Sequence, residues 1–190
     1  GAFGESSSRI LLAERMTGPE VSVFAFLDGE HVSAEIATCD YKRAGEGDVG
    51  LNTGGMGAYG PPEFWTDELA KEVRKEILEP AAKALVSENS SFSGVLYAGL
   101  MITESGPKVI EFNCRFGDPE TQILMPMLES DLLKICLAIA EGRLSDEEVV
   151  WSDTPHTFVV AVSDGYPGSY DTGVEIFGIE KAADSGVVFH

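Results

Sequence analysis

Glycine and proline crowd one stretch of this chain, and that stretch limits what the chain can fold into. Between residues 40 and 62 the sequence contains Gly45, Gly47, Gly50, Gly54, Gly55, Gly57, Gly60, Pro61 and Pro62. This density predicts a long irregular loop rather than a regular helix or strand, because glycine is conformationally free and proline lacks a donor. A loop of this length is usually functional or disordered. We therefore look for a candidate site that includes it.

Regular elements are predicted on both sides of this glycine-rich stretch. Alternating residues of β-branched and aromatic type predict five strands, over residues 20–27, 31–38, 94–102, 108–113 and 157–163. Thr66 caps a predicted helix that runs to about Val86 and that Pro80 should kink. A second helix, in one or two pieces, is predicted from a cap at Asp118 to about Gly142. This mixture predicts an α+β fold in which helices cover one face of an antiparallel sheet.

The character of the sequence changes after residue 148, and we expect a domain boundary there. Residues 1–148 would form the main unit, and residues 149–190 the truncated beginning of a second, C-terminal unit. The chain begins at Gly1 without a methionine and ends at His190 inside an apolar run. We therefore expect it to be an excised piece of a longer protein.

Charge and cysteine content restrict the partners and the compartment. Thirteen Lys and Arg residues against 32 Asp and Glu residues give a net charge of −19. Such a surface disfavours sequence-independent binding to nucleic acid and to anionic membranes, both of which need basic residues. No apolar run approaches the roughly 20 residues that span a bilayer. Three cysteines without a Cys-x-x-Cys pair are typical of a reducing compartment, so we expect a cytoplasmic protein.

A carboxylate and an amide are predicted to lie side by side at the end of the strand over 108–113. In a strand, Glu111 and Asn113 point to the same face, roughly 6.5–7 Å apart. Oxygen ligands of these types suit Mg²⁺, which also keeps water and phosphate ligands. Arg115, two residues further on, could steady a developing phosphoryl or carboxylate charge. The alternative is a polar strand end in which the Asn and Arg side chains only make turn contacts.

A second candidate cluster joins two cations to the glycine-rich stretch. Lys42 and Arg43 are adjacent, which is unusual in so acidic a chain, and glycines let backbone N–H groups converge on an anion. The alternative is a surface loop with a solvated charge pair. The run from Gly45 to Gly50 also matches Gly-x-Gly-x-x-Gly, but a dinucleotide fingerprint must open a helix. More glycine and two prolines follow here, so we reject that interpretation.

Taken together, these segments resemble the phosphoribosylamine–glycine ligase family of ATP-grasp enzymes. The resemblance rests on Asp-x-Lys-Arg, Asn-Thr-Gly-Gly-Met-Gly-Ala-Tyr, Gly-Val-Leu-Tyr-Ala-Gly-Leu-Met-Ile-Thr, Glu-Phe-Asn-Cys-Arg-Phe-Gly-Asp-Pro-Glu-Thr-Gln and Gly-Tyr-Pro-Gly-Ser-Tyr. These motifs follow the family's order and spacing from about Ile10 to His190. The resemblance implies the C-terminal subdomain of an ATP-grasp fold, followed by the start of a small β-rich domain. It also implies that an N-terminal part of the protein is missing from this chain.

The resemblance also implies a reaction and its site residues. ATP would phosphorylate glycine to an acyl phosphate, which the amine of 5-phosphoribosylamine attacks to give glycinamide ribonucleotide, ADP and phosphate in purine synthesis. Mg²⁺ or Mn²⁺ would be held by Glu111 and Asn113, and charge would be neutralised by Lys42 and Arg115. The nucleotide would be contacted by Glu14 and Glu20. The implied substrate-binding set is Arg43, Asn52, Thr53, Gly54, Gly55, Met56, Gly57, Asp118, Pro119 and Glu120.

Two other functions stay open at this stage. The chain could belong to another ATP-grasp carboxylate–amine ligase, although the Asn-Thr-Gly-Gly-Met-Gly loop disfavours this. It could also be a non-catalytic nucleotide-binding or scaffolding module, which Glu111 or Asn113 turned away from the cleft would favour. We further expect the isolated chain to fold but to be inactive, since one of the two subdomains that enclose ATP is mostly absent.

Overall fold

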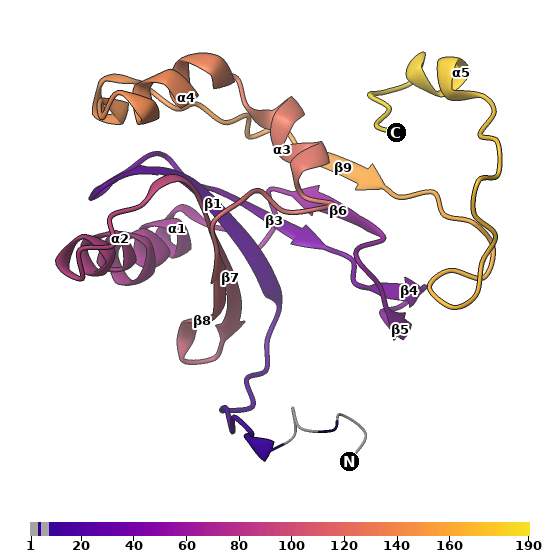
Figure 1. The fold of residues 1–190 in the computed structure, drawn as a ribbon, viewed down its shortest axis with the longest axis horizontal. Helices are drawn as coiled ribbons and strands as arrows, with labels where there is room; N and C mark the ends of the chain where they lie inside the picture. Colours follow the sequence, from indigo (N-terminus) through magenta and orange to yellow (C-terminus); the bar gives the residue numbers. More distant parts are fainter. Residues whose placement is uncertain (1–3, 5–7) are drawn as a thin grey trace.

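The computed structural model describes residue 4 and residues 8–190, and an antiparallel sheet forms its centre (Figure 1). In spatial order its strands are β8 (Gly106–Asn113), β7 (Ser93–Thr103), β1 (Glu20–Asp28), β3 (Ile36–Asp40), β6 (Gly57–Gly60) and β9 (His156–Val159), and β2 (His31–Val32) also pairs with β1. A separate hairpin is made of β4 (Arg43–Gly45) and β5 (Val49–Asn52). Three strands were predicted close to their observed bounds, those over 20–27, 94–102 and 108–113. The α+β prediction is confirmed.

Helices cover both faces of the sheet, so the expectation that they cover one face is wrong. The helices are α1 (Asp67–Val73), a π turn (Arg74–Leu78), α2 (Glu79–Ser87), α3 (Thr121–Met127) and α4 (Leu132–Ala140). In β1, Val23 and Leu27 pack in the core beneath α1 and α2, while Phe24 and Phe26 pack beneath α3 and α4. Because side chains alternate along a strand, a strand that is apolar at both parities must be covered twice.

The helix predicted from Thr66 is present, but its irregularity precedes Pro80. Thr66 Oγ1 accepts a hydrogen bond from Leu69 N at 3.2 Å, as a cap should. The chain then runs through α1, the π turn and α2 without leaving the helical region, and Pro80 lies in the first turn of α2. A proline cannot donate to the carbonyl four residues back. The wider π turn accommodates the missing hydrogen bond. The helix therefore has a π turn before Pro80 in place of the predicted kink at Pro80.

The strand predicted over 31–38 is divided into β2 and β3. Between them, Ser33 N donates to Phe26 O at 2.9 Å, and Ser33 Oγ accepts from Phe26 N at 2.9 Å. A side-chain oxygen thus takes the place of a backbone acceptor opposite Phe26. The guanidinium of Arg74 also donates to the Val32 and Ser33 carbonyls. These competing partners interrupt the regular ladder, an effect that residue propensities do not reveal.

The glycine-rich stretch contains three short strands, which corrects the prediction of an irregular loop. Its glycines allow close backbone approach: a Cβ on Gly57 would lie 2.3 Å from Phe158 O, and one on Gly60 would lie 2.9 Å from Ala37 O. β6 fits between β3 and β9 for this reason. The Gly-x-Gly-x-x-Gly run forms the β4–β5 hairpin and opens no helix, so its rejection as a dinucleotide fingerprint is confirmed.

The helix predicted from Asp118 begins later and is broken. Residues 118–120 form a turn, α3 begins at Thr121, and no side chain caps its N-terminus. The carboxylate of Asp118 instead accepts a hydrogen bond from Gln122 Nε2 at 2.8 Å. α4 follows after Leu128 leaves the helical region, and the Asp131 side chain caps it. The cap prediction was wrong because Asp118 has a side-chain partner that competes with the backbone N–H groups.

The C-terminal part continues the same sheet before it becomes irregular. Val149 and Trp151 pack with the core beneath α4, and β9 pairs with β6. The strand predicted over 157–163 ends at Val159, and a short helix α5 (Ile179–Ala183) follows near the C-terminus (Figure 1). The expected boundary near residue 148 stays a prediction. No helix in the described part of the chain is long and apolar enough to cross a membrane.

Candidate functional site

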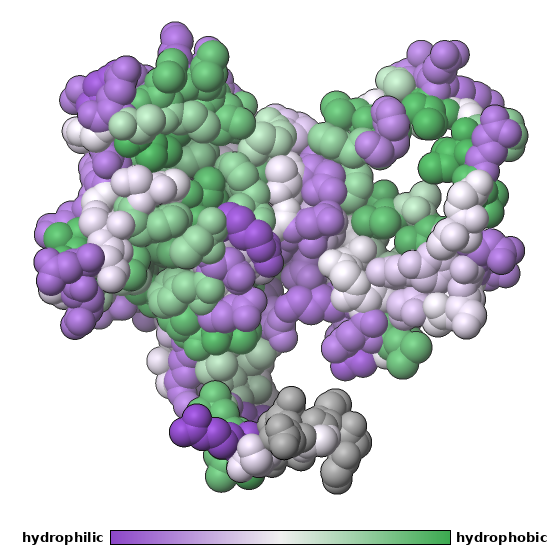
Figure 2. Space-filling model, in the orientation of Figure 1, coloured by the Kyte–Doolittle hydropathy of each residue, from purple (hydrophilic) through white to green (hydrophobic). Residues whose placement is uncertain are grey.

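One face of the sheet is apolar at one end and polar at the other. The register places Phe24 and Ile36 on the same face as Glu20 and Asp40, since β1 and β3 pair directly and side chains alternate. α3 and α4 cover the apolar end. At the polar end, Glu111 is brought onto the same face by the pairing of β8 with β7 and of β7 with β1. Figure 2 shows hydrophilic residues along the middle of the molecule, between the helical part and the C-terminal segment.

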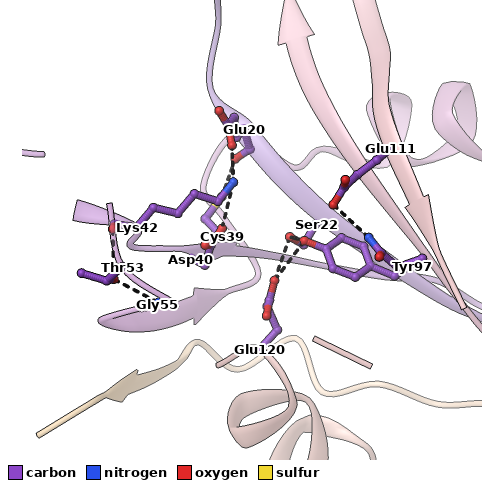
Figure 3. A network of polar contacts seen from close by, with 11 residues as sticks. Glu20, Ser22, Cys39, Asp40, Lys42, Thr53, Gly55, Tyr97, Glu111 and Glu120 are labelled. Carbon is purple, nitrogen blue, oxygen red and sulfur yellow. Dashed lines mark hydrogen bonds and ion pairs between the residues drawn. The ribbon is translucent and has the colours of Figure 1, made fainter. Parts of the chain in front are cut away.

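Lys42 lies between two acidic side chains at this polar end (Figure 3). Its Nζ is 2.5 Å from Glu20 Oε2 and 3.9 Å from Asp40 Oδ1. The Glu20 and Lys42 side chains are about half exposed, whereas that of Asp40 is 12% exposed. The structure therefore brings together two residues that the resemblance implied, Glu20 and Lys42, and adds Asp40 to them.

Burial and charge shift the protonation of this cluster. Burial raises the pKa of Asp40 above its ordinary value, and Glu120 raises it further, although the charge of Lys42 opposes this. Burial lowers the pKa of Lys42, but its hydrogen bond to Glu20 and the charges of Asp40, Glu20 and Glu120 outweigh burial, so the pKa is raised overall. Lys42 is therefore a cation at neutral pH. A cation held this way can meet an anionic ligand.

Glu111 and Asn113 lie side by side, as predicted. Asn113 Nδ2 donates to Glu111 Oε1 at 3.0 Å. Glu111 is exposed, and it lines a small hollow together with Glu20, Asp40 and Lys42. Arg115 lies apart from this cluster in its contacts, because its Nη1 donates to Phe116 O at 2.9 Å within its own turn. The turn-contact alternative thus describes Arg115, while Glu111 faces the hollow.

The Asn-Thr-Gly-Gly loop is tied to the backbone of Lys42. Thr53 N donates to Lys42 O at 2.7 Å, and Thr53 Oγ1 donates to the same carbonyl at 3.0 Å. Gly55 N then donates to Thr53 Oγ1 at 3.0 Å (Figure 3). Met56 N donates to Tyr41 O at 2.7 Å, which closes the loop onto the end of β3. The loop and the Lys42 backbone are therefore held in one local unit, while the Lys42 side chain is paired with Glu20 of β1.

Two segments distant in sequence contact this loop. A Cβ on Gly55 would lie 2.3 Å from Cδ of Pro119, so only glycine fits beside that ring. Gly54 N donates to the hydroxyl of Tyr166 at 3.2 Å. Pro119 of the implied substrate-binding set thus touches the loop. Tyr166, which belongs to the Gly-Tyr-Pro-Gly motif, contacts it from the C-terminal part of the chain.

The two acidic residues of the turn before α3 have different surroundings. Asp118 is exposed, whereas Glu120 is 3% exposed. Glu120 Oε1 accepts hydrogen bonds from Ser22 Oγ and Tyr97 Oη, each at 3.1 Å (Figure 3). Burial raises the pKa of Tyr97, and Glu120 and Asp40 raise it further, so this hydroxyl keeps its proton.

Two implied residues have partners outside the polar cluster. Lys108 Nζ donates to Glu14 Oε1 at 2.7 Å. Lys108 of β8 pairs with Met101 of β7, and Met101 in turn pairs with Glu20 of β1. Glu14 therefore lies near the border of the polar end. Arg43 donates to Gly50 O at 2.8 Å, which braces the β4–β5 hairpin.

A groove with a volume of about 970 Å³ adjoins the cluster. Its charged lining comprises the cations Lys42 and Arg43 and the acids Glu20, Asp40, Glu46 and Asp48, and its aromatic lining comprises Tyr41, Tyr59, Phe64 and Phe158. The rings of Tyr41 and Tyr59 stack with centroids 5.4 Å apart. Stacked aromatic rings beside charged groups of both signs are suited to a ligand that carries a flat or apolar part and polar groups.

Sequence reasoning missed four residues that shape this site. Asp40 stands in the Asp-x-Lys-Arg motif but was given no role, and Tyr166 stands in a quoted motif without one. Ser22 carries a usable signal, because it is the only polar residue within the buried run from Val21 to Leu27. The fourth, Tyr97, gives no such signal in a strand rich in β-forming residues.

Comparison with known proteins gives concordant matches. The family model described as phosphoribosylglycinamide synthetase, ATP-grasp (A) domain, matches residues 1–121. A phosphoribosylamine–glycine ligase of Salmonella typhimurium is 48% identical over 192 residues, covering 100% of this chain and 44% of that protein. One of Pasteurella multocida is 46% identical over 189 residues, covering 99% and 44%. A crystal structure of the Thermotoga maritima phosphoribosylamine–glycine ligase matches with a TM-score of 0.73 and 30% identity, covering 83% of this chain and 39% of that one. The chain thus spans less than half the length of these relatives.

Proposed function

Because this chain belongs to the phosphoribosylglycinamide synthetase ATP-grasp family, we propose that it supplies one wall of the active site of a phosphoribosylamine–glycine ligase. The complete enzyme would join glycine to 5-phosphoribosylamine with ATP, through glycyl phosphate, and release glycinamide ribonucleotide, ADP and phosphate. The observation that carries the proposal is the polar end of the sheet, where Glu20, Lys42 and Glu111 line one hollow. Two carboxylates and a cation in this hollow suit a nucleoside triphosphate and its metal ion.

The donor set of Glu111 and Asn113 fits a divalent cation. A carboxylate and a carboxamide oxygen are the ligand types that Mg²⁺ and Mn²⁺ accept from proteins. Among residues 4 and 8–190, no group of three or more His, Cys, Asp or Glu side chains is arranged to hold a metal by itself. The remaining ligands would therefore be water and phosphate oxygens. Once bound, such an ion neutralises phosphate charge during phosphoryl transfer.

Lys42 is suited to hold an anionic phosphate. It is a cation with an ion pair to Glu20, and an arriving nucleotide offers both a phosphate for Lys42 and ribose hydroxyls for Glu20. Neutralising charge in a fixed geometry is how phosphoryl-transfer sites gain most of their rate. Arg115 would have to leave the Phe116 carbonyl to take part, so we place it second to Lys42 in this role.

The Asn-Thr-Gly-Gly loop and the turn before α3 are suited to hold the two smaller substrates. Both lie beside the polar end, since the loop is bonded to Lys42 and Pro119 touches the loop. Asp118 is an exposed carboxylate next to that contact and could receive the amine of a substrate. We assign glycine and 5-phosphoribosylamine to this region, and ATP to the sheet side. A cytoplasmic location accords with a role of this reaction in purine synthesis and stays a prediction.

The decisive test is a product assay on a full-length chain. We define the completed protein as the Salmonella typhimurium relative in which this sequence replaces the matching segment. It should form glycinamide ribonucleotide from ATP, Mg²⁺, glycine and phosphoribosylamine. Glu111→Gln should remove most of that activity and leave the melting temperature unchanged, because it takes away the charge that holds the metal. Glu104→Gln, in the exposed β7–β8 turn, is the matched control and should remain active.

Two results would contradict the proposal. Ligation of a different carboxylate and amine in place of glycine and phosphoribosylamine would indicate another ATP-grasp carboxylate–amine ligase. ATP binding without any ligation in a well-folded completed protein would favour a nucleotide-binding module. Near-normal turnover in Glu111→Gln would show that Glu111 does not hold the metal, and it would not contradict the proposed reaction.

A further inference from the structure

Glu120 lies beneath the substrate-facing segments. It immediately precedes α3, and its Oε1 is hydrogen bonded to Ser22 of β1 and Tyr97 of β7, each at 3.1 Å (Figure 3). The two hydroxyl oxygens are themselves 2.7 Å apart. One carboxylate therefore joins the start of a helix to two central strands. No ion pair found among the described residues includes Glu120.

The number of protons limits the arrangements that this network can adopt. Ser22 and Tyr97 each carry one hydroxyl proton, and Glu120 Oε1 accepts at hydrogen-bond distance from both hydroxyls. Three contacts share two protons, so either both hydroxyls donate to Glu120, or one donates to the other hydroxyl, which then donates to Glu120. In each arrangement an oxygen of residue 120 must act as an acceptor. A glutamine amide oxygen at this position would meet the same requirement.

The network fixes a turn that reaches the loop. A Cβ on Gly117 would lie 2.2 Å from Glu120 Oε2, and Thr121 N donates to Gly117 O at 3.0 Å, so the turn folds tightly around the Glu120 carboxylate. Pro119, the residue before Glu120, packs against Gly55 with no room for a side chain between them. Displacement of Glu120 would therefore displace both Asp118 and the Asn-Thr-Gly-Gly loop.

We propose that Glu120 is a positioning residue that anchors the turn over 117–120, and through Pro119 the Asn-Thr-Gly-Gly loop, to the central sheet. It acts as a hydrogen-bond acceptor, and its charge does not bind substrate. The proposal rests on the proposed function in one respect, because it assigns these two segments to glycine and phosphoribosylamine. It replaces the implied role of Glu120 as a substrate ligand, since a residue 3% exposed offers a ligand almost no surface.

Glu120→Gln and Glu120→Ala separate the two roles in the completed protein. Gln keeps an acceptor for Ser22 and Tyr97, so kcat/KM for glycine should stay within about threefold of the unsubstituted protein, a difference of less than a kcal/mol in barrier. Ala removes the acceptor, and kcat/KM for glycine should fall on the order of 100-fold, as when reacting groups are misplaced. KM for ATP should change by less than about threefold in both, because ATP is assigned to the sheet side.

Two further variants complete the set. Glu129→Ala removes an exposed carboxylate beyond the other end of α3 and should leave activity and loop mobility unchanged. Tyr97→Phe removes a single hydroxyl and provides a mild variant if Glu120→Ala folds poorly. It should change KM for glycine in the same direction as Glu120→Ala, by a smaller factor.

Amide hydrogen exchange without substrates provides an independent measurement. The amide hydrogens of residues 53–57, 117, 118, 120 and 121 should exchange faster in Glu120→Ala and at the original rate in Glu120→Gln. If Gln is as inactive as Ala while exchange stays normal, the charge of Glu120 acts on a ligand and the proposal is overturned. It is also overturned if Ala lowers the melting temperature and leaves KM and local exchange unchanged. If the unsubstituted protein makes no product, the proposed function fails, and the exchange comparison still decides whether Glu120 anchors the loop.

Discussion

Gly55→Ala adds one carbon atom at a point where the structure leaves no space for it. The new Cβ would lie 2.3 Å from Cδ and 2.9 Å from Cγ of Pro119. Gly55 also has a φ of +131°, which residues with a side chain rarely adopt. The ring of Pro119 is rigid and buried, so it cannot move aside as a long flexible side chain could. Either the loop keeps its place at a cost, or it moves away from Pro119.

The expected cost follows from these two effects. A non-glycine residue in a disfavoured backbone conformation costs about 1–3 kcal/mol. Overpacking at a tight contact costs roughly another 1–3 kcal/mol, less whatever the loop recovers by shifting. We therefore expect the free energy of unfolding to fall by about 3 kcal/mol, or roughly 6–12 °C in melting temperature for a chain of this size.

Two other glycines of the same stretch separate the cost of backbone strain from the cost of the steric clash. Gly54→Ala would place its Cβ 3.7 Å from the Tyr166 hydroxyl, an ordinary contact, and should be nearly neutral. Gly47 has a φ of +73° and nothing within 4 Å, so Gly47→Ala should cost about 1 kcal/mol through strain alone. Urea unfolding followed by tryptophan fluorescence and circular dichroism measures all three variants. Equal midpoints for Gly55→Ala and Gly54→Ala would refute the packing of Pro119 against this loop.

Three further predictions concern the charged cluster and the chain as a whole. Lys42→Met should abolish most ligation by the completed protein. It should lower the free energy of unfolding by less than about 1 kcal/mol, since half-exposed ion pairs contribute little. A sharp fall in melting temperature with unchanged activity per folded molecule would show a structural role instead. The 190-residue chain alone should fold, bind ATP weakly in calorimetric titration and make no product, and tight binding or measurable product would contradict this. Burial raises the pKa of the Asp40 carboxyl group, so the folded state binds the carboxyl proton more tightly than the unfolded state does. The contribution of Asp40 to stability is therefore complete below the ordinary pKa and is lost as pH rises through the raised pKa of the folded state. Asp40→Asn should remove this fall from the pH dependence of the urea midpoint, and an unchanged dependence would mean that Asp40 titrates normally.

Local patterns in the sequence were enough to predict several elements and one pair of side chains. The strand over 108–113 places Glu111 and Asn113 together because strand geometry alone puts residues two apart on one face. The hairpin that joins β7 to β8 follows from the turn signal Ser105-Gly106-Pro107, which separates two strand-forming runs. Thr66 caps α1 as predicted, since capping depends on residues within one turn. Each of these results depends on neighbours in the chain.

Contacts between distant segments decided the rest. The glycines of residues 45–60 predict a loop when taken alone, and only the approach of β9 and of Pro119 shows why Gly57 and Gly55 lack side chains. The resemblance implied Glu120 only as a substrate-binding residue, and the contacts with Ser22 of β1 and Tyr97 of β7 are what make it a buried acceptor. These outcomes could not be predicted from a single sequence, because burial and hydrogen-bond partners depend on which segments meet in space, and a residue's type fixes only what it could bond.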